Sequence, residues 1–362
     1  ACPSSTTLAP PSRPPPMRST DDEKQAQIDD LQHFQSACDT EAGATLTDLQ
    51  SAALGGGALY VKRDDCTGLA MGGNKARQLE YYFGEALQQN ADTVLITGAV
   101  QSNFVRMAAA GAAKLNLDCH IQLEERVGDA GANYRQSGNV LLDRLLGATI
   151  HTYSKGEDED GADTNLEMIA GELRSAGKRP YIIPLAPGHP PLGALGYVRA
   201  AEEILDQLDD LEDEIEHIFV ASGSGSTHAG LLFGFRSLNW PKPVTGVCVR
   251  RNRDLQQERI NNRCREIAEL LDMDNPVTSE DIRITDETFA PGYGKLNDQT
   301  LEAIDLCARR EGLLLDPVYT GKSMAACLNH VRSSQNNQST LFIHTGGTPG
   351  LFGYSKELNL AD

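Results

Sequence analysis

The stretch Ile218-Phe219-Val220-Ala221-Ser222-Gly223-Ser224-Gly225-Ser226-Thr227 joins an apolar strand to a loop of glycines and hydroxyl residues. The residues that follow have the apolar spacing of a helix. A strand, glycine-rich loop and helix in this order bring free backbone N–H groups and a positive helix end to one spot, which can hold a phosphate. A tight turn without a ligand has the same composition, so the loop alone leaves both interpretations open. The loop runs from Ser222 to Thr227.

Two nucleotide-binding motifs match the chain less well. A dinucleotide loop follows the pattern Gly-x-Gly-x-x-Gly, and His228 occupies the third glycine position. After the next strand, Arg250 and Arg251 stand where an acidic residue is expected, which leaves an NADP-binding oxidoreductase as a distant alternative. A P-loop fits worse still, because Asp316 stands where its first glycine should precede Gly321-Lys322-Ser323.

Short apolar runs alternate with segments of helical spacing along most of the chain. Strands are expected at residues 94–97, 120–123, 181–185, 217–221, 244–249 and 341–344. Helices are expected at residues 105–115, 133–146, 195–208, 260–271 and 301–310. In the second of these helices, one apolar face should be formed by Val140, Leu141, Leu145 and Leu146. This order predicts an α/β fold with open, mostly parallel sheets covered by helices.

Composition narrows the class of protein. The 362 residues, 40% of them hydrophobic, can build a substantial core and fit two domains. No apolar run approaches the roughly 20 residues that span a bilayer. The net charge of −19 argues against nucleic acid and membranes as partners. The 8 cysteines form no CxxC pair, which predicts free thiols in a reducing compartment, buried at Cys119 and Cys248, and no metal site.

Residues 1–45 differ from the rest of the chain. Prolines cluster between Pro10 and Pro16 among Ser and Thr, and the polar run 21–30 follows. This composition predicts a disordered or loosely attached extension. Because the sequence begins at Ala1 rather than Met, a processed product or a targeting remnant is open, although arginine is scarce there. We expect a cytoplasmic protein, or an organellar one if the extension is a targeting remnant.

Lys75 is the candidate nucleophile. It follows Gly72-Gly73-Asn74 and precedes a helix with an apolar face that includes Leu79 and Phe83. A lysine at such a junction can have a lowered pKa and react as an amine with an aldehyde, whereas most lysines at helix starts simply face water. Together with the phosphate loop, it suggests a cofactor that carries both an aldehyde and a phosphate, which is pyridoxal 5'-phosphate (PLP).

Further polar residues follow expected strands. Gln101-Ser102-Asn103 can cap a helix or direct donors at a ligand from the carboxyl end of a sheet, and the two roles are compatible. Tyr293 lies in the Pro/Gly loop 290–294, and Tyr319 lies in the segment 316–322. For each tyrosine alone, partly buried packing is the default interpretation. Residues 344–347, which include Thr345, end the last strand.

Seven segments match one family in its own order: 60–65, 72–75, 101–103, 222–230, 289–294, 315–322 and 344–347. The chain resembles the PLP-dependent D-cysteine desulfhydrases and aminocyclopropane-carboxylate deaminases, which have the two-domain tryptophan synthase β-like fold (fold type II). The resemblance implies a large PLP-binding domain at residues 46–77 and 189–362 and a small domain at 78–188. It also implies a homodimer that acts on a small amino acid.

The resemblance assigns roles by position. Lys75 would hold PLP covalently, and Asn103 would bond its phenolic oxygen. Ser102 would contact the substrate carboxylate or shuttle a proton. Tyr293 and Tyr319 would flank the substrate as acid, base or leaving-group contacts. The phosphate would be held by Ser224, Gly225, Ser226 and Thr227.

Thr320 separates two branches of the family. The deaminases resemble Tyr-Glu-Gly-Lys here, with the glutamate facing the pyridine nitrogen, whereas this chain has Tyr319-Thr320-Gly321-Lys322, as the desulfhydrases do. A hydroxyl from Thr320 or Thr345 makes a shallower electron sink than a carboxylate, which favours β-elimination over ring opening. We therefore expect conversion of D-cysteine to pyruvate, hydrogen sulfide and ammonia.

Two departures and one further similarity leave the leaving group open. Phe104 stands where relatives more often carry a polar residue, and Pro187-Gly188-His189-Pro190 replaces a stretch that resembles Gly-Gly-Ser-Asn. Cys66-Thr67-Gly68-Leu69 is similar to the L-cysteate sulfo-lyases of this family. Cysteate cleavage, aminocyclopropane-carboxylate deamination and a PLP-binding homologue without activity therefore stand as alternatives.

Overall fold

The computed structural model describes residues 46–49, 58–128, 130–156, 158–185, 188–333 and 338–358. The predicted N-terminal extension at residues 1–45, with Cys2 and Cys38, lies outside the described residues, and so does Pro187. In the part that is described, no helix is long and apolar enough to cross a membrane. The six cysteines found there are free thiols, and Cys119 and Cys248 are buried as predicted.

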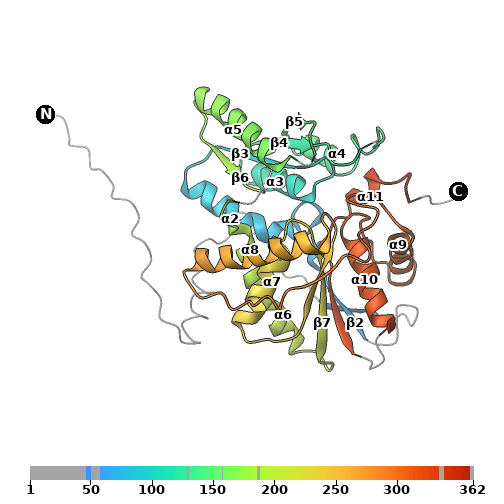
Figure 1. Ribbon diagram of the computed structural model, residues 1–362. Helices are drawn as coiled ribbons and strands as arrows, with labels where there is room; N and C mark the ends of the chain where they lie inside the picture. Colours follow the sequence, from blue (N-terminus) through green and yellow to red (C-terminus); the bar gives the residue numbers. More distant parts are fainter. Residues whose placement is uncertain are drawn as a thin grey trace.

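Two sheets organise the chain, one above the other in Figure 1. The larger sheet has the order β1 (Leu46–Leu49), β2 (Leu59–Lys62), β10 (Ser339–Ile343), β7 (Ile215–Ser222), β8 (Val244–Cys248) and β9 (Arg283–Thr285). The smaller sheet has the order β5 (Thr149–Tyr153), β4 (Asp118–Glu124), β3 (Thr93–Ala99) and β6 (Pro180–Ile183). All neighbouring strands are parallel except β1 and β2.

Helices cover both faces of the larger sheet, which explains why its strands are apolar runs. Successive side chains of a strand point to opposite faces, and in β7 Ile218 and Val220 join one core while Phe219 joins another. The first core includes α6 (Leu195–Leu208), α7 (Ser226–Ser237) and α8 (Arg253–Leu271). The second includes α9 (Asp298–Glu311) and α10 (Thr320–Ser333).

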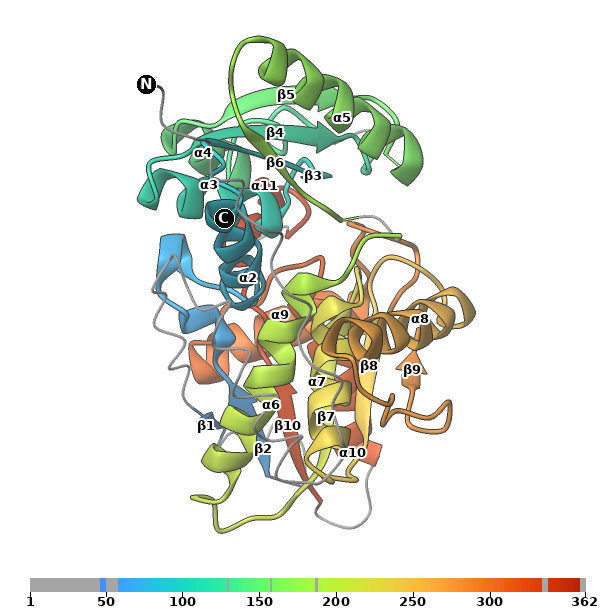
Figure 2. The same ribbon diagram turned by 90° about the vertical axis from the view of Figure 1, so that its left-hand side faces the viewer.

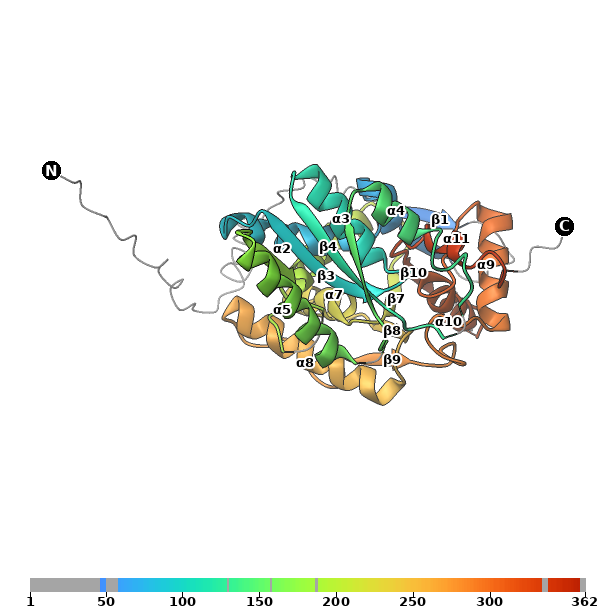
Figure 3. The same ribbon diagram turned by 90° about the horizontal axis from the view of Figure 1, so that it is seen from above.

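The smaller sheet is also covered on both faces. Val94 and Ile96 pack with α3 (Asn103–Lys114), while Leu95 packs on α5 (Glu159–Ser175). Helix α2 (Lys75–Gln88) contacts both α3 and α6, so it joins the two sheets (Figure 2). Seen from above, the smaller sheet lies over the larger one (Figure 3). The short elements are η2 (Asp64–Cys66), η3 (Leu69–Met71), α4 (Asn139–Leu145), η4 (Leu192–Ala194) and α11 (Gly350–Gly353).

The α/β class with mostly parallel sheets is confirmed, but the helix expected at residues 133–146 is wrong in extent. Helix α4 begins only at Asn139, because Gly138 has a positive φ of 58° and the Asn133 and Ser137 side chains donate to the carbonyl of Phe352. That contact comes from the far end of the chain, so local spacing cannot indicate it. The expected apolar face is wrong too, since two of its four residues point to solvent: Leu141 is 56% exposed and Leu145 is 78% exposed. The domain boundaries at 77/78 and 188/189 stay a prediction.

Candidate active site

A cavity of about 800 Å³, including its open mouth, lies where the carboxyl ends of both sheets meet. Open α/β sheets bind ligands at this edge. Most of the residues singled out from the sequence line it: Lys75, Ser102, Asn103, Ser224, Gly225, Thr227, Tyr293, Tyr319 and Thr345. Ser226 lines a small neighbouring cavity, and Thr320 lines neither.

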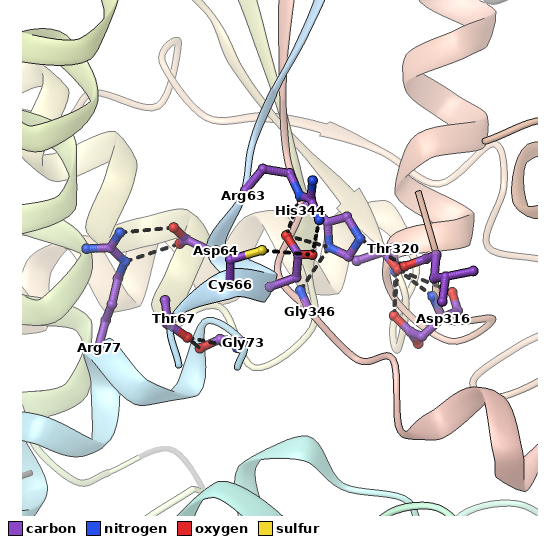
Figure 4. Close-up of polar contacts among 12 residues, drawn as sticks. Arg63, Asp64, Cys66, Thr67, Gly73, Arg77, Asp316, Thr320, His344 and Gly346 are labelled. Carbon is purple, nitrogen blue, oxygen red and sulfur yellow. Dashed lines mark hydrogen bonds and ion pairs between the residues drawn. The ribbon is translucent and has the colours of Figure 1, made fainter. Parts of the chain in front are cut away.

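Backbone contacts fix the loop that carries Lys75. The N–H of Gly73 donates to the Thr67 hydroxyl at 2.9 Å and lies 3.0 Å from the carbonyl of Asp64 (Figure 4). The Asp64 carboxylate is itself held by Arg77 of α2, 3.0 Å away. Gly346 packs against this loop so closely that a Cβ there would lie 2.6 Å from the Gly73 Cα. The first residue of α2 is thereby held against the end of the larger sheet.

The Lys75 amine lies in surroundings that favour its neutral form. Its Nζ donates to Gln78 Oε1 at 3.2 Å and lies 5.1 Å from the centre of the Phe104 ring. No carboxylate among the described residues forms an ion pair with it. Burial therefore lowers the pKa of Lys75 to about 8. An amine with this pKa is a competent nucleophile and base near neutral pH.

The glycine-rich loop presents unused donors to the cavity. Gly225 has φ +98° and caps α7 without a side-chain acceptor, so the first N–H groups of that helix have no partner from the cap. The Thr227 hydroxyl accepts from Asn74 Nδ2 at 2.9 Å and from Gln78 Nε2 at 2.8 Å. Because a hydroxyl has two acceptor positions and one proton, both acceptor positions are filled and the proton remains for a ligand. This arrangement fits a phosphate group.

Asn103 is oriented by a neighbour on α4. Ser102 caps α3 as predicted, its Oγ accepting from the Val105 N–H at 3.3 Å. Asn103 Oδ1 accepts from Asn139 Nδ2 at 3.0 Å. Since that bond uses the amide oxygen, the Nδ2 group of Asn103 is the part left to donate to a ligand. This geometry matches a donor to an anionic oxygen, the role that the resemblance implies for Asn103.

Tyr293 and Tyr319 come from separate loops and meet at the cavity. Their hydroxyl oxygens lie 2.7 Å apart. Burial raises the pKa of both hydroxyls, and Arg126 opposes this rise in each. The hydrogen bond from Tyr319 further favours ionisation of Tyr293, and raises the pKa of Tyr319 itself. The pair can therefore pass a proton between them.

Thr320 faces away from the cavity. Its hydroxyl donates to Asp316 Oδ1 at 2.8 Å, and its side chain is fully buried (Figure 4). The same carboxylate also accepts from the N–H groups of Val318, Tyr319 and Thr320, so it caps the start of α10. Of the two threonines considered for the pyridine nitrogen, only Thr345 lines the cavity.

Some residues near the site were missed or given another role. Arg126 and Arg250 line the cavity; Arg126 lies in no motif of the sequence, and Arg250 is expected only as a partner for NADP. The signal was their position just after β4 and β8, at the carboxyl edge. Phe104 lines the main cavity, whereas His189 lines the small one and contacts Asp163 at 3.1 Å. Cys66 is exposed and lines neither.

A buried lysine amine and a glycine-rich loop that line one cavity at the edge of two mostly parallel sheets fit a PLP site. The match to a family model agrees: the model for "Pyridoxal-phosphate dependent enzyme" covers residues 39–346. The chain belongs to this family. The NADP alternative is therefore wrong, and His228, where a third glycine would be needed, is a buried residue whose Nδ1 lies 3.2 Å from Ser222 Oγ.

One similar solved structure supports the same family, and two others share the fold. The chain is similar to an "ACC deaminase homologue", with 36% identity, a TM-score of 0.80 and coverage of 92% of this chain and 98% of that one. It shares its fold with an O-ureido-L-serine synthase, at 16% identity, a TM-score of 0.61 and coverage of 88% and 94%. A hydrogen sulfide-producing enzyme from Fusobacterium nucleatum has 15% identity, a TM-score of 0.59 and coverage of 87% and 98%.

Substitution of Thr227 by valine should weaken cofactor binding, because valine keeps the shape but removes the hydroxyl proton offered to the phosphate. A hydrogen bond to a charged group contributes about 1.5–3 kcal/mol, so the Kd for PLP should rise by at least about tenfold. Titration of the apoprotein with PLP measures this. Thr245→Val serves as the control, since Thr245 lies on β8 and does not line the cavity. An unchanged Kd for Thr227→Val contradicts the phosphate role.

Proposed function

We propose that the protein catalyses β-elimination from a small amino acid, with D-cysteine as the first candidate substrate. The products are then pyruvate, hydrogen sulfide and ammonia, with one water consumed. The family and the cofactor type are known from the comparisons. The reaction within the family is our inference from the groups around the cavity.

The observation that carries this proposal is the absence of a carboxylate from the cavity wall. None of its described lining residues is Asp or Glu. Asp316, the nearest acidic residue to Tyr319 in the chain, is held by N–H groups of the α10 cap and is 1% exposed. With only the Thr345 hydroxyl as a partner for the ring nitrogen, the bound cofactor would be a shallow electron sink. A shallow sink suits elimination, in which the negative charge on the α-carbon is short-lived, better than ring opening, which requires a deeper sink.

The side chains can divide the work of elimination among them. When bound, PLP supplies an electron sink for the charge that deprotonation leaves on the substrate α-carbon. Lys75, as a neutral amine, takes the α-proton. Ser102 and the N-terminus of α3 receive the substrate carboxylate, since helix N-termini favour anions. Tyr319 and Tyr293 deliver a proton to the departing group.

A second candidate is ring opening of aminocyclopropane-carboxylate, favoured by the similarity to the deaminase homologue. Cleavage of cysteate is a third, and the arginines at the cavity favour it. We also propose a cytoplasmic homodimer, on the basis of the family resemblance alone.

A panel of substrates tests the proposal. The PLP-loaded protein is mixed separately with D-cysteine, L-cysteine, L-cysteate and aminocyclopropane-carboxylate, and pyruvate, oxobutyrate, sulfide and sulfite are measured. We expect pyruvate and sulfide from D-cysteine. Oxobutyrate as the main product would contradict elimination and indicate the deaminase. No product from any of the four would indicate a PLP-binding homologue without this activity.

A further inference from the structure

The cavity contains more places for anions than the cofactor and a simple amino acid require. The α7 N-terminus with Thr227 fits a phosphate, and the α3 N-terminus at Ser102 fits a carboxylate. A third positive region is formed by Arg126 and Arg250, which also line the cavity. This region is not needed for an amino acid with a neutral side chain.

Arg126 has a donor group that no described residue uses. Its Nε and Nη2 both donate to one oxygen of Glu124, at 3.0 and 2.8 Å. A guanidinium has five N–H donors, and those of Nη1 have no acceptor among the described residues. The Arg126 side chain is only 6% exposed, and it lines the cavity. The unused edge of the guanidinium is thus available to a ligand inside the site.

The surroundings of Arg126 remain positive although the whole chain is acidic. Glu159, at the start of α5, contacts Arg250 at 2.6 Å, Arg251 at 2.7 Å and Arg259 at 3.4 Å. One carboxylate therefore faces three guanidinium groups. The net charge of the chain is −19, so this local excess of positive charge is a feature of the site rather than of the surface. A desolvated cation of this kind favours an anionic ligand group.

The position of Arg126 relates it to the leaving group. It follows β4, next to the strand β3 whose end forms another part of the cavity wall. Tyr293 and Tyr319 line the same cavity as Arg126, and the charge of Arg126 acts on both hydroxyls, so the guanidinium lies near the pair that the proposed elimination assigns to the departing group. A group held by Arg126 would accordingly lie beside these hydroxyls.

We propose that Arg126 is a specificity residue that binds an acid group on the β-carbon of the substrate, so that the enzyme accepts amino acids with a sulfonate or sulfate substituent. This inference rests on the proposed elimination and extends its substrates beyond D-cysteine. With cysteate, Lys75 takes the α-proton and the Cβ–S bond breaks with its electron pair leaving on sulfite. The three-carbon remainder takes up one water to give pyruvate and ammonia, and no oxidant or reductant is needed.

The experiment compares kcat/KM for three substrates, each as both enantiomers: cysteate, cysteine and β-chloroalanine. Arg126→Gln should lower kcat/KM for cysteate about 30-fold or more, the loss expected for a hydrogen bond to a charged group. The loss for cysteine and β-chloroalanine should be at least about tenfold smaller than the loss for cysteate, because neither carries an acid group for Arg126 to bind. The single variant leaves the buried Glu124 carboxylate without its cation and can therefore misfold. The double variant Arg126→Gln with Glu124→Gln removes both charges, so it tests the same loss of Arg126 without that defect.

Arg135→Gln is the matched control, because it changes the net charge equally but lies in an exposed ion pair with Glu125. It should leave all three substrates unaffected. An equal loss for all substrates in the Arg126 variants would overturn the inference, since Arg126 would then serve the α-carboxylate or the fold. If the unaltered enzyme cleaves cysteine but not cysteate, the inference about Arg126 is also overturned, and the proposed function remains intact. No elimination from any substrate overturns the proposed function itself.

Discussion

Replacing Lys75 by alanine should abolish covalent cofactor attachment and lower turnover by at least about a thousandfold, because one side chain supplies both the amine for the aldehyde and the base for the α-proton. The absorbance band that distinguishes covalently bound from free PLP should disappear. Spectra of the reconstituted variant and assays with the best substrate measure both effects. An active variant that still shows the band would contradict the role of Lys75.

Lys322 provides a demanding control for this result. Burial also lowers its pKa to about 8, so both lysines have the same tendency to be neutral. Their surroundings differ, because Lys322 Nζ donates to the carbonyls of Phe289 and Gly292 and does not line the cavity. Lys322→Met should therefore keep the band of the bound cofactor. Loss of the band in both variants would mean that it reports folding rather than attachment.

Tyr319→Phe should lower kcat about a hundredfold while the Kd for PLP stays within about threefold, since the ring remains and only the proton-carrying hydroxyl is lost. The partner Tyr293 loses its 2.7 Å hydrogen bond, and its pKa should rise further. Steady-state kinetics and a PLP titration of the same preparation separate the two effects.

Tyr134→Phe is the control for Tyr319→Phe. Tyr134 forms a similar edge-to-face pair with Tyr354, but it does not line the cavity. Its substitution should change kcat less than about threefold. If Tyr319→Phe is as active as Tyr134→Phe, the hydroxyl pair does not take part in proton transfer.

The sequence predicts most of the elements whose signal is local. Strands β3, β4, β7 and β10 can be predicted because they are runs buried on both faces. The capping role of Ser102 follows from its residue type and its position just before a helix. Strand β5 cannot be predicted from the sequence, because none of its five residues is buried and it lacks the apolar run that marks a strand in this fold. Helix α5 has only a weak apolar pattern as well, since only Ala162, Leu166 and Ala170 of its 17 residues are buried.

The site could be predicted where a single residue type implies a function. Lys75 and the glycine-rich loop belong to that class: both line the cavity, and their roles stay predictions. The orientation of Asn103 by Asn139 and the orientation of Thr227 by Asn74 and Gln78 could not be predicted, because each depends on a contact between segments far apart in the chain. Thr320 is the reverse case, since its hydroxyl donates to Asp316 at the start of α10 and its side chain does not line the cavity.

The most direct test of the central claim is to locate the covalent link between protein and cofactor. The PLP-loaded protein is reduced with borohydride, digested, and analysed by mass spectrometry. We predict one pyridoxyl phosphate adduct, on the peptide that contains Lys75, and none on the peptide that contains Lys322. An adduct confined to another lysine, or no adduct in protein that has bound PLP, would contradict the account.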